Sequence, residues 1–283
     1  MSDSMGGAPP PPPPPPSGGG GGPLPARTLG DILSTAFEVY KANAAKLITI
    51  VAIVVIPLAF VGSLFQNVLF KVETEEITIG GTTVETITSS RGFFAFLAAT
   101  MIVAALAYVM AFVLQSIWVR AAAQAVLGDP VDAQASYRYG FKRFGSVALI
   151  AILSGLIIFG GLLLFVIPGF IFAVFLSLVI PALVVENRRG ADALGRSWNL
   201  VSGSFWHVLG TVLVAGILAA VVSGLIGALG GSNFFLSWIF GSIGQIITTP
   251  FTALVSVILY LDLRARHESL TADTLRSEIA TGA

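Results

Sequence analysis

The stretch that decides the fold covers residues 144–185 and reads FGSVALIAILSGLIIFGGLLLFVIPGFIFAVFLSLVIPALVV, without one charged residue. A single α-helix of this length would measure about 60 Å, twice the roughly 30 Å of hydrocarbon in a bilayer. The run must therefore fold back on itself. Pro168-Gly169 is the expected turn, because proline cannot continue the helical hydrogen-bond ladder and glycine accepts a positive φ.

Uncharged runs on both sides of this stretch add four further spans. The same length argument splits residues 205–261 at Gly230-Gly231-Ser232-Asn233. We therefore predict an all-α, polytopic membrane protein with six transmembrane helices, at about 47–70, 93–119, 147–167, 170–185, 205–229 and 234–261. Composition agrees with this prediction, because only 11% of the 283 residues are charged and the mean hydropathy is +0.89, whereas soluble domains are about 25% charged.

The positions of the cations predict the orientation, because cytoplasmic loops carry an excess of Lys and Arg. An arrangement with both termini inside places only Lys71 and Arg91 outside the cell membrane. The cations on the cytoplasmic side are then Arg27, Lys41, Lys46, Arg120, Arg138, Lys142, Arg143, Arg188, Arg189, Arg196, Arg264, Arg266 and Arg276.

The exterior loop, residues 71–92, is predicted to hold a β-hairpin. Alternating residues flank Gly80-Gly81, a pair that suits a two-residue turn. This register places Ile77 opposite Val84 and Glu76 opposite Glu85. We expect water to screen the like-charge pair, and a bound cation or partner is the alternative.

Three segments are predicted. Residues 1–26 contain eight consecutive prolines and five consecutive glycines, and we expect a disordered cytoplasmic tail, a solvated spacer rather than a ligand for a proline-binding module. Residues 27–266 form the membrane domain, and residues 267–283 form a second cytoplasmic tail.

A segment with helical apolar spacing precedes each odd-numbered span. The three segments start near Thr28, at Asp129-Pro130 and at Gly190. In the second segment we expect Asp129 to be the N-cap and Pro130 to lie in the first turn. We interpret the chain as three copies of one unit, a cytoplasmic amphipathic helix followed by a helical hairpin. Ordinary duplication is the favoured explanation, and a three-fold cup that binds anionic lipid headgroups is the alternative.

Chemistry-bearing residues are scarce. Cysteine is absent and histidine occurs twice, which excludes disulfides and cysteine-based metal sites. Every charged residue lies outside the predicted spans, which disfavours proton relays and ion-coupled transport. His207 is expected to be an interfacial ring rather than a catalytic base. Zero net charge disfavours nucleic-acid binding. We expect no enzyme activity, cofactor or metal.

Small residues recur every four positions in the fifth span, at Gly216, Ala220, Gly224 and Ala228. Such a stripe predicts close helix packing. We favour packing within the bundle over packing against another copy of the chain.

Three sequence motifs resemble those of a known family. They are LGDILSTAFEVY at residues 29–40, PALVVE at 181–186 with ALGRSWNLV at 193–201, and YLDLRARHE at 260–268. This pattern resembles a bacterial six-helix family, the membrane domain of glycerophosphoryl diester phosphodiesterases. The resemblance implies a membrane module that accompanies a phosphodiesterase domain or stands alone. We expect no diesterase activity here, because the residues flanking the spans are too few for a catalytic barrel.

Charged residues of these motifs are predicted to meet at the cytoplasmic face. The predicted cluster comprises Glu186, Arg196, Trp198, Asp262, Arg264 and Arg266. Salt bridges would hold the third amphipathic helix to spans four and six, with Trp198 in the headgroups. The alternative is recognition of headgroup phosphate by the arginines.

The leading functional hypothesis is a non-enzymatic membrane module that assists or organises a lipid or cell-envelope process through its cytoplasmic face. Membrane lipids with anionic headgroups and an envelope or lipid-enzyme protein are the expected partners, and the oligomeric state is left open. The alternative is a transport or lipid-scrambling pathway, not ion-coupled, for a neutral or amphiphilic substrate, opening near Pro57, Pro181 and Pro250. An interfacial lipid enzyme that uses His207 ranks last.

Overall fold

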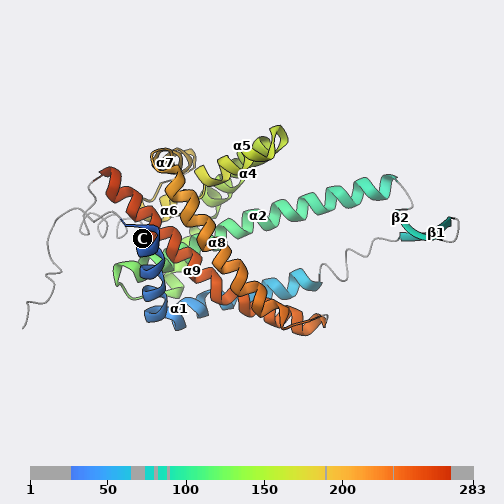
Figure 1. Ribbon diagram of the computed structural model, residues 1–283, viewed down its shortest axis with the longest axis horizontal. Coiled ribbons are helices and arrows are strands. Elements are labelled where there is room, and N and C mark those ends of the chain that lie inside the picture. Colours follow the sequence, from blue (N-terminus) through green and yellow to red (C-terminus); the bar gives the residue numbers. More distant parts are fainter. Residues whose placement is uncertain are drawn as a thin grey trace, which may run out of the picture.

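The computed structural model describes residues 27–64, 74–79, 82–87, 90–188, 190–231 and 233–268. The predicted tails at 1–26 and 269–283 lie outside the described residues. Within the described ranges the chain is helical apart from one two-stranded hairpin (Figure 1). In chain order the elements are α1 (Leu29–Leu64), β1 (Thr74–Ile79), β2 (Thr82–Ile87), α2 (Ser90–Leu127), α3 (Ala133–Lys142), α4 (Phe144–Leu164), α5 (Val166–Phe175), α6 (Val179–Val185), α7 (Ala191–Ser202), α8 (Phe205–Ala228) and α9 (Phe234–Glu268).

Six stretches of these helices are long and apolar enough to cross a membrane. They are Leu29–Phe60, Thr100–Leu127, Phe144–Leu164, Val166–Val185, Phe205–Ala228 and Phe235–Glu268. Large apolar side chains cover their outer faces, for example Leu163, which is 73% exposed, and Leu225, which is 68% exposed. Apolar surface of this extent indicates contact with lipid rather than water. The prediction of a helical chain with six candidate membrane spans is confirmed.

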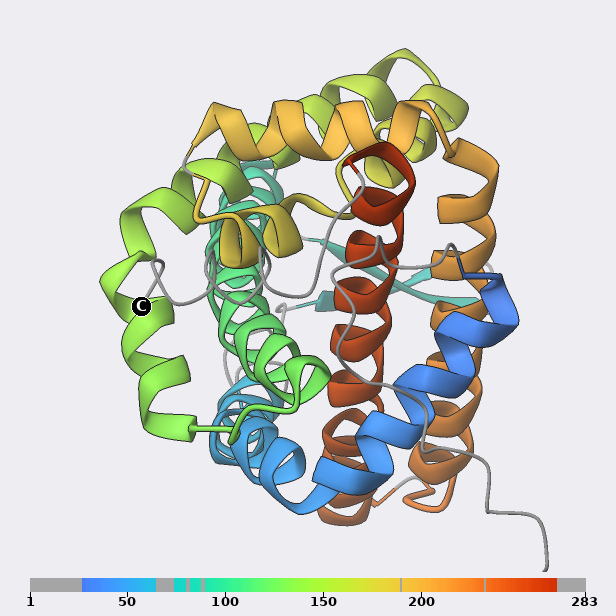
Figure 2. The ribbon, with the colours of Figure 1, turned by 90° about the vertical axis from the view of Figure 1, so that its left-hand side faces the viewer.

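Three helical segments lie across one end of the bundle. Figure 2 looks onto this end and shows the first part of α1, α3 and α7 around the last turns of α9. Helix α1 then changes direction and continues along the bundle, as both views show. The core is densest around α9, where Leu254, Ile258 and Tyr260 are fully buried. We call this end the charged end, because the ion pairs described below lie there.

The fold-back in the uncharged run lies earlier than predicted. Helix α4 ends at Leu164, and the chain reverses at Phe165, whose φ of −162° and ψ of 156° are extended. Pro168 and Gly169 lie in the first turn of α5, where the missing N–H of proline leaves no helical bond unmade. Gly169 instead permits close packing, because a Cβ there would lie 2.5 Å from Cγ of Leu162.

The second span also differs from its prediction at its C-terminal end. Helix α2 continues to Leu127, so the candidate span contains Arg120, which the sequence placed just beyond a span ending at residue 119. Gly128, at φ +76°, then ends the helix, with hydrogen bonds from Gly128 N to Ala125 O and from Asp129 N to Gln124 O. This pattern is the Schellman motif.

The N-cap of α3 is Asp132 and not Asp129 as predicted. The Asp132 carboxylate accepts a hydrogen bond from Ala135 N at 3.0 Å. Asp129 belongs instead to the end of α2, where its N–H is already used. At the start of α1, Thr28 and Asp31 cap each other reciprocally, with Thr28 N donating to Asp31 Oδ2 at 2.9 Å and Asp31 N donating to Thr28 Oγ1 at 3.3 Å.

The β-hairpin has the predicted register. Strands β1 and β2 pair antiparallel, with Ile77 opposite Val84 and Glu76 opposite Glu85. The turn residues Gly80 and Gly81 lie outside the described residues.

The small-residue stripe of α8 does not pack within the bundle, which corrects the favoured prediction. Gly216, Ala220, Gly224 and Ala228 are all exposed, and a Cβ on Gly216 or Gly224 would have no atom within 4 Å. Another face of α8 packs on α9, where Ser223 and Thr248 share a hydrogen bond of 2.9 Å. The close approach there depends on Gly244, at which a Cβ would lie 3.0 Å from Cα of Ser223.

Candidate functional site

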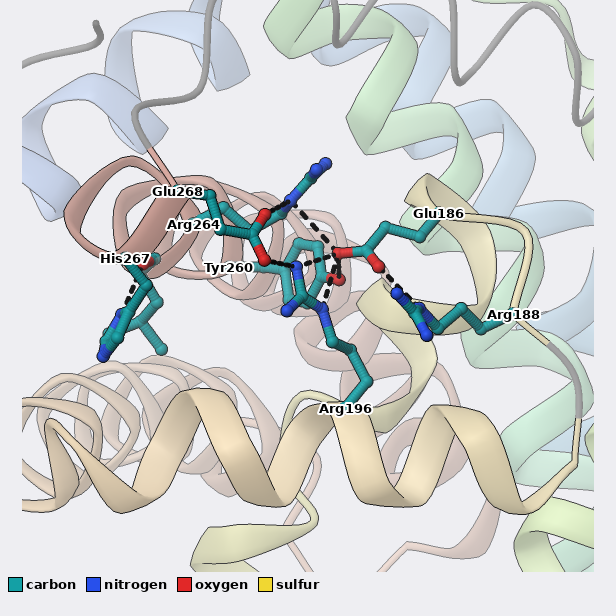
Figure 3. A network of polar contacts seen from close by, with 8 residues as sticks. Glu186, Arg188, Arg196, Tyr260, Arg264, His267 and Glu268 are labelled. Atoms are coloured by element: carbon teal, nitrogen blue, oxygen red, sulfur yellow. Dashed lines mark hydrogen bonds and ion pairs between the residues drawn. The ribbon is translucent and has the colours of Figure 1, made fainter.

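The charged end contains a network of ion pairs around Glu186, which caps the C-terminus of α6. Glu186 Oε1 accepts hydrogen bonds from Nη2 and Nε of Arg196 at 2.7 and 2.8 Å, and Arg264 Nε lies 3.1 Å from the same oxygen. Glu186 Oε2 accepts from Arg188 Nε at 2.7 Å. The Tyr260 hydroxyl also donates to Glu186 (Figure 3). One carboxylate thus binds groups from the α6–α7 connection, from α7 and from α9.

A second carboxylate completes this network. Glu268, at the end of α9, accepts from Arg264 Nε at 3.0 Å and pairs with Arg196. Arg196 and Arg264 are therefore each shared between two acids. We refer to Glu186, Arg188, Arg196, Tyr260, Arg264 and Glu268 as the Glu186 cluster. Because its members come from α6, α7 and α9, the cluster holds the ends of these helices together.

Burial and pairing act in opposite directions on the ionisation of this cluster. Burial alone would raise the pKa of Glu186, but hydrogen bonds from Arg196, Tyr260 and Arg188 and the charge of Arg264 outweigh it and hold that pKa below its ordinary value. Burial alone would lower the pKa of Arg196, but hydrogen bonds to Glu186 and Glu268 raise it. Both groups are therefore charged at neutral pH, and each stabilises the charge of the other.

Asp262 forms a separate cluster on another side of α9. Its carboxylate accepts from Arg266 Nε at 2.8 Å and from the backbone N of Arg27 at 2.6 Å, and His207 Nε2 lies 3.3 Å from Oδ2. Arg266 also donates to the backbone oxygen of Arg27. We refer to Asp262, Arg266, His207 and the Arg27 backbone as the Asp262 cluster, which joins α9 to the start of α1 and to α8.

The structure brings together some of the predicted residues and separates others. Glu186, Arg196 and Arg264 meet in one cluster, whereas Asp262 and Arg266 belong to the other. Trp198 belongs to neither, because its ring stacks on Phe175 with centroids 4.2 Å apart and lies 5.9 Å from Phe172. The single interlocking cluster that the sequence predicted is therefore two clusters and an aromatic contact.

Sequence reasoning missed Tyr260, Glu268 and Arg188 as members of the Glu186 cluster. Helical spacing could have found Glu268, because it follows Arg264 by four residues and so shares its face of α9. The same spacing pairs Asp262 with Arg266. No comparable signal marks Tyr260, whose side chain is fully buried.

The arrangement offers charge pairing rather than an evident reaction centre. His207 has Asp262 beside it, but the described contacts place no nucleophilic hydroxyl against its ring. His267 Nδ1 lies 2.8 Å from the backbone oxygen of Leu263, and its ring packs against Gly203. In the part of the chain that the structure describes, no group of three or more His, Asp or Glu side chains is placed to hold a metal.

Comparison with known proteins gives a family match over most of the chain. The model of the family of unknown function DUF7544 matches residues 4–265. No curated protein and no solved structure matches the chain.

Proposed function

Because the chain belongs to this family, whose function is unknown, we propose a function from the geometry: a non-enzymatic membrane module that assists or organises a lipid or cell-envelope process through its charged end. In this proposal the charged end faces the cytoplasm, so that both termini are inside, and the chain consists of three repeats of an amphipathic helix and a helical hairpin. Its resemblance to the membrane domain of glycerophosphoryl diester phosphodiesterases agrees with a module that works beside a lipid enzyme.

The observation that carries the proposal is the mutual pairing of charges in the two clusters. Arg196 and Arg264 are each bound by two carboxylates, and Arg266 is bound by Asp262. Arginines paired in this way hold helices in place and leave little capacity to bind a substrate. The clusters thus support a fixed platform at the charged end rather than a site of turnover.

Exposed side chains around the platform suit contact with a membrane surface. Phe37 on α1 and Phe141 on α3 are exposed, and Lys41 Nζ lies 4.9 Å from the centroid of the Phe37 ring. Lys46 and Lys142 are exposed on the same two helices. Aromatic and basic side chains together are typical of helices that lie in the interface of an anionic membrane.

Complementation in cells tests the proposal. Deleting the gene should change the lipid composition or permeability of the envelope, and the wild-type gene should restore it. A variant with Lys41→Gln, Lys46→Gln and Lys142→Gln should reach the membrane at normal levels but should not restore the lipid composition or permeability of the envelope. The matched control neutralises three exposed acids, Glu38→Gln, Asp129→Asn and Asp192→Asn, and should restore it. Rescue by the lysine variant would contradict the proposal.

Purified protein in liposomes separates the competing functions. Under the proposal the protein alone moves no labelled lipid or solute, and His207→Ala restores the deleted strain. Movement of lipid by the wild-type protein would support the transport alternative. Loss of a lipid turnover in a normally folded His207→Ala variant would support an enzyme.

A further inference from the structure

Arg120 is a buried cation at the charged end, on α2. Its side chain is only 6% exposed, and its Nε has no hydrogen-bond partner. The guanidinium carbon lies 4.4 Å from the centroid of the Tyr139 ring on α3. A cation–π contact of this kind compensates only part of the cost of removing a guanidinium from water.

A second arginine approaches the same ring. The guanidinium carbon of Arg143, at the corner between α3 and α4, lies 5.0 Å from the Tyr139 centroid. Its Nη1 is also buried without a hydrogen-bond partner. The Tyr139 hydroxyl donates to Leu183 O at 3.1 Å, which fixes the ring between α3 and α6. Two like charges are thus held close to one rigid ring.

Arg120 and Arg143 differ from the arginines of the Glu186 cluster in the acids beside them. There, each arginine has one or two carboxylates within 3.1 Å. Among the described residues, neither Arg120 nor Arg143 has a carboxylate in ion-pair distance. Two neighbouring guanidinium groups with unused donors and no acid beside them suit a phosphate oxyanion, which can bridge both.

We propose that Arg120 and Arg143 form a binding site for a phosphate group, carried either by an anionic lipid headgroup or by free phosphate. Arg143 is partly exposed, and the phosphate reaches Arg120 from that side. The inference deepens the proposed function and rests on it only for the choice of lipid as a source, because the anion site follows from the two arginines themselves.

Binding to the purified full-length protein in detergent tests the site. The probes are a soluble short-chain phosphatidylglycerol, the matching phosphatidylcholine and inorganic phosphate, and the measured quantities are the ligand-dependent rise in melting temperature and the mass of bound ligand in native mass spectrometry. We expect phosphatidylglycerol to bind and phosphatidylcholine not to bind. Arg120→Gln and Arg143→Gln should each weaken binding about tenfold, because each removes a charged hydrogen-bonding partner.

Arg138→Gln is the matched control, since Arg138 lies on α3 but is exposed. This variant should bind like the wild type. If inorganic phosphate binds as well as phosphatidylglycerol, the ligand of the site is free phosphate. If phosphatidylglycerol binds and inorganic phosphate does not, the ligand is a lipid headgroup. Absence of binding, or equal weakening by Arg138→Gln, would overturn the site. Neither result would change the outcome expected in the complementation experiment, so each proposal can be refuted without the other.

If Arg120→Gln does not accumulate, Arg143→Gln decides the question, because Arg143 is less buried. A purely structural role for Arg120 predicts that Arg120→Gln lowers the melting temperature without any ligand. The anion site predicts that the same variant melts at the wild-type temperature or above it in ligand-free detergent, because an unpaired buried charge has been removed.

Discussion

Glu186 is the carboxylate on which the stability of the charged end depends most. Its side chain is only 6% exposed and contacts three arginines. Replacing it with glutamine removes the negative charge and leaves Arg264, also 6% exposed, with the more exposed Glu268 as its acid. Removing one partner of a buried pair costs about 3 to 5 kcal/mol. We therefore expect Glu186→Gln to lower the free energy of unfolding by about 3 kcal/mol, measured by thermal unfolding in detergent.

The exposed Glu38 provides the control for this prediction. Glu38→Gln should change the stability by less than about 0.5 kcal/mol, as is usual for surface positions. If the two variants melted at the same temperature, the Glu186 cluster would not hold the helix ends.

The pH dependence of stability follows from the same residue. The pKa of Glu186 is lowered in the folded protein from the ordinary value of 4.5. Between the two pKa values the unfolded chain binds more protons than the folded one, so this contribution to stability is fully present above about pH 5 and is lost as the pH falls through the folded pKa. Melting temperatures measured from pH 7 down to pH 3.5 should fall more steeply for the wild type than for Glu186→Gln. Parallel curves would contradict the pairing.

The division into two clusters is a consequence of helical geometry that the motif alone does not display. Successive residues of an α-helix point about 100° apart, so Asp262 and Arg264 face nearly opposite sides of α9. Arg264 and Glu268 share one side, and Asp262 and Arg266 share the other. The sequence predicted which charges lie at the span ends. It could not predict which elements each side of α9 meets, because that depends on the packing of distant helices.

The contact between α8 and α9 depends on one glycine. A Cβ at Gly244 would lie 3.0 Å from Cα and 3.1 Å from the backbone oxygen of Ser223. A leucine there must push the helices apart and disturb the hydrogen bond between Ser223 and Thr248. Overpacking of this kind costs about 1 to 3 kcal/mol. We expect Gly244→Leu to lower the melting temperature in detergent by several degrees.

Gly216→Leu is the matched control, because Gly216 is also a helical glycine in a span but a Cβ there has open space around it. This variant should melt at or above the wild-type temperature, since leucine is the better helix former. The reverse order of the two variants would show that the exposed stripe of α8, and not Gly244, packs against another helix.

The glycine and proline residues predicted that a helix break or a close helix contact occurs, but not the position that each of these residues takes in it. The prediction that the uncharged run folds back is confirmed, but Pro168 lies in the first turn of α5 instead of at the turn between the helices, and the chain reverses at Phe165. A small-residue stripe predicted packing on α8, yet the glycine that packs there belongs to α9. Spacing within one helix indicates a smooth face. It does not say which neighbour lies against that face, because apolar spans look alike in composition.

The number of spans followed from apolar length, whereas the arrangement around α9 did not. All six candidate spans were expected from runs that exceed the bilayer thickness. The central position of α9 depends on side-chain packing that no run length encodes. The placement of α1, α3 and α7 around one end (Figure 2) makes the orientation of the whole molecule testable at several points.

Because the chain contains no cysteine, single cysteines can be introduced without any background. Ser34→Cys on α1, Gln134→Cys on α3 and Asn199→Cys on α7 replace exposed residues on the three segments at the charged end. Thr78→Cys places a thiol in β1. If the positive-inside rule sets the orientation, a membrane-impermeant maleimide added to intact cells should label only the cysteine at position 78.

Labelling after the membrane is made permeable gives the control, since all four cysteines should then react. Reaction of the thiols on α1, α3 and α7 in intact cells, with none at position 78, would reverse the orientation and place the Glu186 cluster outside. A mixed result among the three helices would instead contradict their common placement at one end. The physical reason for expecting a uniform result is that the cations gathered on these segments are held back together on the cytoplasmic side during insertion.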